Sequence, residues 1–75
     1  MPIMDKDTFL IKLGNRIREL RNEKEITQVQ LAHAIGKDQQ SVQRLEAGKI
    51  NPSAYYLYEI ATGLNVRLEE LFKQL

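Results

Sequence analysis

Four polar side chains on one short stretch have the chemistry to read the edges of nucleic-acid bases: Gln39, Gln40, Gln43 and Arg44. A glutamine amide carries a hydrogen-bond donor beside an acceptor, so it can pair with the N6 and N7 edge of adenine. An arginine guanidinium can pair in a similar two-pronged way with O6 and N7 of guanine. The alternative is a solvated surface that happens to be rich in glutamine, but lysine and glutamate are more usual on such surfaces. We therefore favour base reading.

The pattern around these side chains predicts a short helix over about residues 38–47 that would hold them in solvent. Val42 and Leu45 stand three residues apart and mark an inward face. Asp38 is a suitable N-terminal cap, and Gly48 closes the helix. The glutamines and the arginine are then left on the outward face.

A second short helix is predicted just before this one. Thr27 and Gln30 have the spacing of a capping box, Ile26 and Leu31 that of a hydrophobic staple, and Gly36 supplies a left-handed end. Neither short helix is stable alone in water, so both must dock on their neighbours. Two helices joined by a glycine-containing turn form a helix-turn-helix unit, whose second helix can enter the major groove of DNA.

The rest of the chain is also helical in pattern, with no alternation typical of strands. A first helix from about Asp7 to Lys24 has an apolar stripe at spacings of three and four, made by Phe9, Leu10, Leu13, Ile17 and Leu20. Gly14 inside this helix predicts close packing of another helix.

Two more helices complete the expected architecture. Asn51-Pro52-Ser53 opens a fourth helix, whose apolar face consists of Tyr56, Leu57, Ile60, Ala61 and Leu64. A short fifth helix carries Val66, Leu68, Leu71 and Phe72. We predict an all-α, compact five-helix domain over residues 7–75, preceded by a short tail over residues 1–6.

Size and composition narrow the function. The 75 residues make one small domain, and with no cysteine and a single histidine, His33, disulfides and thiolate or histidine-rich metal sites are excluded. We predict no metal and no cofactor. We also predict no enzymatic activity, because Ser41 and Ser53 are explained as helix-start residues and His33, an expected surface residue, has no orienting carboxylate.

Net charge and hydropathy say less about function than the motifs do. The net charge is +1, and the first third is crowded with basic residues: Lys12, Arg16, Arg18, Arg21 and Lys24. Acidic Glu59, Glu69 and Glu70 gather towards the other end, and such asymmetry can orient a protein on a polyanion, although an ordinary solvated helix surface explains it equally well. No run approaches the ~18 to 20 apolar residues of a membrane span. We expect a soluble, cytoplasmic protein.

The order and spacing of these residues along the chain resemble those of the phage repressor and Cro helix-turn-helix family, also called XRE-like. The resemblance spans roughly residues 10 to 72. It is carried by Thr27-Gln28-Val29-Gln30-Leu31-Ala32, Ile35-Gly36, Gln39-Gln40-Ser41-Val42, Leu45-Glu46-Ala47-Gly48 and Pro52-Ser53, then by Leu57, Ile60-Ala61, Leu64-Asn65-Val66 and Leu71-Phe72. A single T-Q-x-x-L-A motif would be weak, but the full register is specific. It implies a lambda repressor-like DNA-binding fold.

The resemblance also implies roles for individual residues. Gln39, Gln40 and Arg44 match base-reading positions, and Gln43 faces the groove wall, where it can touch phosphate or base. Gln28 matches a glutamine that contacts a phosphate and braces the first residue of the recognition helix.

Further matches concern the DNA backbone and the core. Lys49 and Ser53 match a loop that grips the DNA backbone. Arg21 and Glu46 match a buried structural ion pair. Many relatives have asparagine where this chain has Ala47, so a phosphate contact made there would be missing.

The expected function is a sequence-specific, double-stranded DNA-binding transcriptional regulator, specifically a repressor. The resemblance implies a homodimer formed through Leu68, Phe72 and Leu75, whose recognition helices lie about one DNA turn apart, roughly 34 Å, on a palindromic operator. Tyr55 and Tyr58, off the apolar face, mark an interface or are scattered surface aromatics. Two alternatives stay open: an antitoxin-type regulator that also binds a toxin protein, and a helical interaction module without DNA binding.

Overall fold

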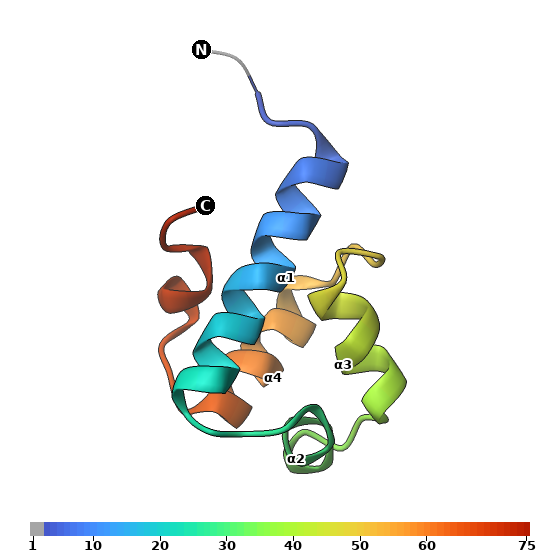
Figure 1. The fold of residues 1–75 in the computed structure, drawn as a ribbon, viewed down its shortest axis with the longest axis vertical. Coiled ribbons are helices and arrows are strands. Elements are labelled where there is room, and N and C mark those ends of the chain that lie inside the picture. Colours follow the sequence, from blue (N-terminus) through green and yellow to red (C-terminus); the bar gives the residue numbers. More distant parts are fainter. Residues whose placement is uncertain (1–2) are drawn as a thin grey trace.

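A computed structural model describes residues 3–75, which fold as four α-helices followed by one 3₁₀ helix (Figure 1). The elements are α1 (Lys6–Glu23), α2 (Gln28–Ala34), α3 (Gln39–Glu46), α4 (Ala54–Leu64) and η1 (Leu68–Phe72). The all-helical expectation is confirmed for this part of the chain. The count of five α-helices is wrong, because the fifth element is a 3₁₀ helix.

The change from α to 3₁₀ at the C-terminal end follows from how α4 stops. Asn65 takes the left-handed conformation (φ 56°) and closes α4, and Arg67 is extended with no side-chain cap for the next element. Only five residues remain before the chain becomes extended again at Lys73. Such a short segment cannot offset the cost of nucleating an α-helix, so it takes the tighter winding.

Each α-helix begins after a polar residue whose side chain accepts a hydrogen bond from a backbone amide three residues on. These caps are Asp5, Thr27, Asp38 and Ser53. The capping box is complete: Thr27 Oγ1 accepts from the Gln30 amide at 3.0 Å, and Gln30 Oε1 accepts from the Thr27 amide at 2.8 Å. Helix α1 begins at Lys6, one residue earlier than expected, and residues 1–2 of the expected tail lie outside the described residues.

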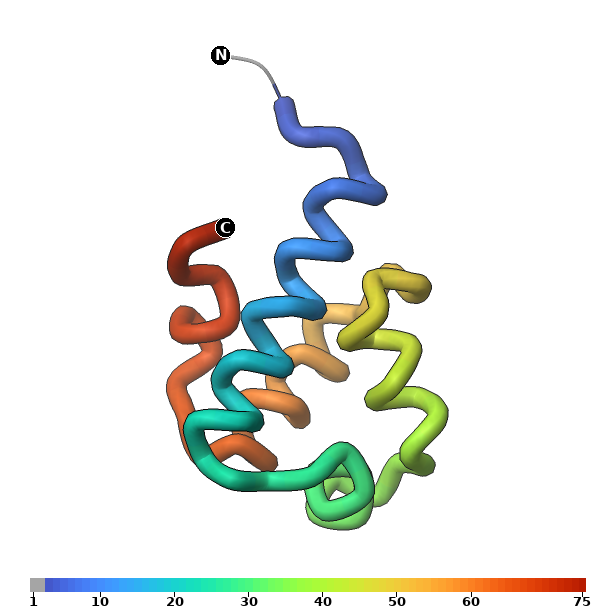
Figure 2. The backbone as a smooth tube through the Cα atoms, in the orientation of Figure 1, coloured from blue at the N-terminus to red at the C-terminus, as the bar shows by residue number. Residues whose placement is uncertain are grey.

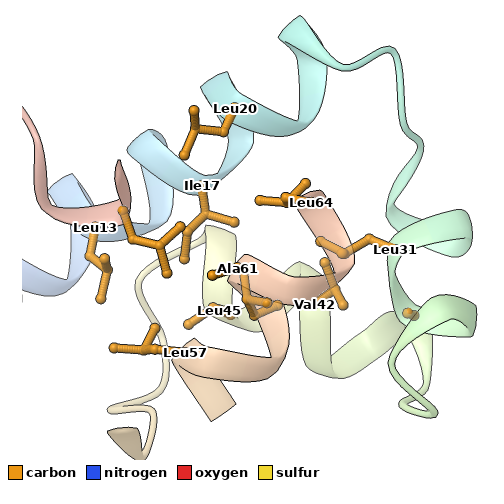
Figure 3. Packing of buried hydrophobic residues seen from close by; sticks show 12 residues of the cluster. Leu13, Ile17, Leu20, Leu31, Val42, Leu45, Leu57, Ala61 and Leu64 are labelled. Atoms are coloured by element: carbon orange, nitrogen blue, oxygen red, sulfur yellow. The ribbon is translucent and has the colours of Figure 1, made fainter. Parts of the chain in front are cut away.

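A single core joins all five elements (Figure 3). Its members are the apolar residues Leu13, Ile17, Leu20, Leu31, Ala32, Val42, Leu45, Leu57, Ile60, Ala61, Leu64 and Leu71. The short helices α2 and α3 contribute Leu31, Val42 and Leu45, each almost fully buried, so their stability comes from this docking.

The predicted close approach at Gly14 occurs between α1 and α3. A Cβ atom added at Gly14 would lie 2.7 Å from the carbonyl oxygen of Leu45 and from the carbonyl carbon of Glu46. Only glycine lets α1 contact the last turn of α3 this tightly. The turn between α2 and α3 uses Gly36 differently, because its φ of 69° is left-handed and its side is open.

Helix α1 separates two surfaces of the molecule. Helix α3 packs along one side of α1 and η1 along the other, while the first turns of α1 project beyond the body (Figure 2). Helix α3 and the C-terminal segment are therefore on different sides of the domain. Among the helices of residues 3–75, none combines the length and the apolar character that crossing a bilayer requires.

Candidate nucleic-acid interface

Helix α3 presents a polar outer face and a buried inner face. Gln39, Gln40, Gln43 and Arg44 are all exposed. On the opposite face Val42 is fully buried, and Leu45 and Glu46 are each 1% exposed. The structure thus brings all four expected base-reading side chains onto one surface, which we call the α3 face.

The α3 face continues into the loop that follows α3. Gln40, Gln43, Arg44, Ala47 and Lys49 surround a hollow of about 260 Å³. Ala47 has the shortest side chain of these five residues. Lys49 is exposed beside Arg44, so two cations border the same hollow.

Ser53 and Tyr56 connect the next helix to this region. Ser53 is exposed, and its Oγ accepts from the Tyr56 amide at 3.0 Å, so it caps α4. The phenol oxygen of Tyr56 lies 2.6 Å from Oγ of Ser41 on α3. Sequence reasoning missed this contact, because nothing in the pattern of either helix pairs these two residues.

A buried ion pair anchors α3 to α1. Nε and Nη2 of Arg21 donate to the two carboxylate oxygens of Glu46 at 2.6 and 3.0 Å, and Nη1 of Arg21 donates to the Ile26 carbonyl at 2.9 Å. The Glu46 side chain is fully buried and that of Arg21 is 12% exposed. The pair therefore joins α1, the α1–α2 turn and α3.

The environment of Glu46 favours its charged form. Burial alone raises the pKa of this carboxyl, but hydrogen bonds from Arg21 and Gln28 and the charges of Arg21 and Arg18 outweigh burial, so the net pKa is lowered. The hydrogen bond to Glu46 raises the pKa of Arg21. Both groups are thus ionised at neutral pH.

Gln28 links this pair to the exposed end of α3. Its Nε2 donates to Oε1 of Glu46 at 3.0 Å, and its Oε1 accepts from Nε2 of Gln39 at 3.5 Å. Gln28 thus lies next to Gln39, the first residue of α3, while its contact with a phosphate stays a prediction. The bond from Gln28 to Glu46 was not anticipated.

Three other residues discussed from the sequence, His33, Tyr55 and Tyr58, lie apart from the α3 face. His33 is exposed on α2. Tyr55 and Tyr58 are 67% and 55% exposed, with ring centroids 5.9 Å apart, and they border a separate hollow with Ala34 and Ile35. Across residues 3–75, histidine, aspartate and glutamate side chains form no group of three that could hold a metal ion.

Comparison with known families shows which kind of protein carries the α3 face. A family model described as Helix-turn-helix matches residues 17–71, most of the chain. The chain belongs to the XRE-type helix-turn-helix family. The match includes α2, α3 and α4, the helices around the α3 face.

Individual relatives agree with this membership. An uncharacterized helix-turn-helix transcriptional regulator of Archaeoglobus fulgidus is 44% identical over 60 residues, which cover 80% of this chain and 86% of the relative. The crystal structure of the restriction-modification controller protein C.AhdI from Aeromonas hydrophila superimposes with a TM-score of 0.84 at 38% identity, covering 87% of this chain and 98% of that one.

A second similar structure shows a relative on DNA. It is the restriction-modification controller protein C.Esp1396I, solved as a tetramer in complex with its natural 35 base-pair operator. Its TM-score is 0.74 at 28% identity, and the match covers 85% of this chain and 95% of that one.

This helix-turn-helix domain is therefore a DNA-binding transcriptional regulator. The relatives described above are regulators and controller proteins rather than enzymes, as the sequence predicts. A toxin partner has no support among them.

Proposed function

We propose that this helix-turn-helix protein is a sequence-specific repressor that binds double-stranded DNA as a homodimer on a palindromic operator. In this proposal α3 enters the major groove, and Gln39, Gln40, Gln43 and Arg44 contact the bases. The observation that carries the proposal is the exposure of these four side chains on a helix whose inner face is fully anchored. The cytoplasmic location expected from the sequence stays part of the proposal.

Residues beside the α3 face are proposed to hold the DNA backbone. Lys49 offers an exposed ammonium group at the edge of the hollow next to α3. Gln28 and Ser53 lie at the starts of α2 and α4, where a side-chain N–H or O–H can donate to a phosphate oxygen. Such contacts fix the orientation of α3 without reading sequence.

The proposed dimer uses the C-terminal side of the domain. Leu68 and Phe72 on η1 are both 41% exposed, which is high for large apolar side chains. Leu75, also expected at this contact, packs partly against the core instead and leaves less surface for a partner. Because η1 and α3 lie on different sides of α1, a two-fold contact through η1 leaves both α3 faces free for DNA.

A protein-interaction role beside DNA binding is favoured by one specific observation, the exposed tyrosine pair. Tyr55 and Tyr58 offer an aromatic surface typical of protein interfaces, as an interaction module would need. The α3 face argues against a module without DNA binding, since its amides and guanidinium suit base edges better than they suit an apolar partner.

Selection of binding sites from a random duplex pool tests the proposal. We expect enrichment of an inverted repeat whose half-sites are about 10 to 10.5 base pairs apart, centre to centre. Affinity for the selected site should fall steeply with added salt, because phosphate contacts release counterions. The proposal would be refuted if no sequence is enriched from the pool. It would also be refuted if the affinity for DNA does not change with salt concentration. Transcription from a promoter that contains the site should fall when the protein is present, and a rise would make it an activator.

A further inference from the structure

A continuous chain of polar side chains runs from the core to the base-reading surface. It begins at Arg21, passes through the buried carboxylate of Glu46 and the half-buried amide of Gln28, and ends at the exposed amide of Gln39. The donor–acceptor distances along it are 2.6, 3.0 and 3.5 Å.

At the buried end of this series of hydrogen-bonded side chains, the direction of donation is fixed. The Arg21 guanidinium donates and cannot accept, whereas an ionised carboxylate accepts and cannot donate. Arg18 adds a second cation, with its Nε 3.5 Å from Oε1 of Glu46. Gln28 must therefore turn its NH₂ group towards Glu46, which leaves its carbonyl oxygen pointing at Gln39.

We infer that Glu46 is a positioning residue that sets the base preference of Gln39, although its own side chain is buried away from DNA. This inference rests on the proposed function. Because Gln28 offers Gln39 only an acceptor, Gln39 must use one N–H of its amide on Gln28. It keeps one N–H and its carbonyl oxygen for DNA.

That remaining pair of groups favours adenine over guanine. Adenine presents an acceptor at N7 and a donor at N6, which match one N–H and one carbonyl oxygen. Guanine presents acceptors at both N7 and O6, so it needs two donors, and Gln39 has only one left. The ion pair in the core thereby contributes to specificity at the surface, besides its structural role.

The substitution Glu46→Gln should end this fixed direction of donation. Oε1 of Glu46 accepts from both Arg21 and Gln28, whereas an amide in its place has one end that donates and one that accepts. When the NH₂ group of the new amide faces Gln28, Gln28 turns its oxygen inward and its NH₂ group outward. Gln39 then accepts from Gln28, and both N–H groups of Gln39 are free to donate to guanine.

The test measures affinities of wild type and variants for two duplexes that differ only by A·T or G·C at the base pair assigned to Gln39. That pair is assigned beforehand as the position at which Gln39→Ala removes base preference. We expect wild type to prefer adenine and Glu46→Gln to lower the A-to-G affinity ratio by up to about tenfold, which is within the value of one two-pronged base contact. Base preference at the base pair assigned to Arg44 should stay unchanged. Equal loss of affinity for both duplexes would overturn the inference and leave Glu46 purely structural.

Two further variants complete the test. Glu23→Gln removes the same charge from an exposed site on α1 and should leave the ratio at its wild-type value. Gln28→Met breaks the chain while keeping the Arg21–Glu46 pair, and should lower the ratio about fivefold, the worth of one hydrogen bond. If Glu46→Gln does not fold, Gln28→Met decides: an unchanged ratio refutes the inference. A wild-type protein with no preference at any base pair would instead refute the proposed function.

Discussion

The hydroxyl oxygens of Ser41 and Tyr56 lie 2.6 Å apart and join the first turn of α3 to α4. Both side chains are half-buried, and the amino group of Lys37 lies 5.5 Å from the centre of the Tyr56 ring. The first turn of α3 also carries Gln39 and Gln40. The contact therefore fixes the part of the recognition helix that the proposed function places deepest in the groove.

Tyr56→Phe should lower the free energy of unfolding by about 0.5 to 1.5 kcal/mol, because it removes one half-buried hydrogen bond and little else. Ser41→Ala should cost a similar amount, and the double variant should cost little more than either single one. Urea denaturation of the four proteins measures this coupling. Tyr58→Phe, which changes an exposed hydroxyl, is the matched control and should stay within about 0.5 kcal/mol. Strictly additive losses in the double variant would show that the contact contributes nothing.

The stability supplied by Glu46 should depend on pH in the acid range. Its pKa in the folded protein is lowered from an ordinary value of 4.5, so folding favours the ionised form. That contribution is fully present above the unfolded pKa and is lost as the pH falls through the folded pKa. Arg21, whose pKa is raised, stays charged over this whole range.

Comparison with Glu46→Gln isolates this effect from other carboxylates. Asp5 and Glu70 also have lowered pKa values, so acid weakens wild type and variant alike through them. At pH 7 the variant should be less stable by about 3 kcal/mol, near the lower end for breaking a buried pair. The difference should shrink steadily below about pH 4.5. A difference that stays constant down to pH 3 would contradict the assigned ion pair.

Replacing Gly14 or Gly36 with alanine should lower the stability of the folded protein, for a different reason at each position. Gly14→Ala forces a methyl group against backbone atoms of Leu45 and Glu46, so α1 and α3 must separate, at about 1 to 3 kcal/mol. Gly36→Ala meets no atom but strains a left-handed residue, at about 1 to 2 kcal/mol. Asparagine tolerates the left-handed conformation, so Gly36→Asn should be milder than Gly36→Ala, whereas Gly14→Asn should be worse than Gly14→Ala. Thermal unfolding of the four variants checks this order, and the same order at both positions would disprove it.

Local features of the fold could be predicted from sequence because neighbouring residues determine them. The Thr27–Gln30 capping box and the left-handed Gly36 depend on spacings of a few residues. The exposure of the α3 face follows from the inward positions of Val42 and Leu45 on the same helix. These features carry the candidate interface, so most of it was predictable.

Features decided by tertiary contacts could not be predicted in the same way. The bond from Gln28 to Glu46 joins residues 18 positions apart, and it exists only because α2 and α3 pack at the Arg21 side chain. Glu25 adopts a left-handed φ of 57° between α1 and α2, with no glycine or asparagine to signal it. The 3₁₀ winding of η1 likewise depends on how Asn65 ends the helix before it.

The proposed dimer predicts that Phe72→Glu dissociates the protein. A two-fold contact through η1 would bury this side chain, and burying an unpaired carboxylate there should cost at least about 2 kcal/mol. Sedimentation should show a monomer, and affinity should fall on a full palindrome but hold on a single half-site. Tyr55→Glu places the same charge on the other exposed aromatic surface and should stay dimeric. If Tyr55→Glu dissociates instead, the dimer forms through the tyrosine pair and the η1 assignment is wrong.

Arg44→Ala and Lys49→Ala should weaken DNA binding in distinguishable ways, although both remove one cation from the same hollow. Arg44 projects from α3, so its loss should cost about 1 to 3 kcal/mol on the selected site and relax preference at a single base pair. Lys49 lies in the loop after α3, so its loss should weaken binding on all sequences and lower the salt slope by about one. Affinities for the selected site and its single-base variants, each measured across a salt series, separate the two. A uniform loss on every sequence for Arg44→Ala would make Arg44 a phosphate contact, because only a side chain that touches a base can change the ranking of bases.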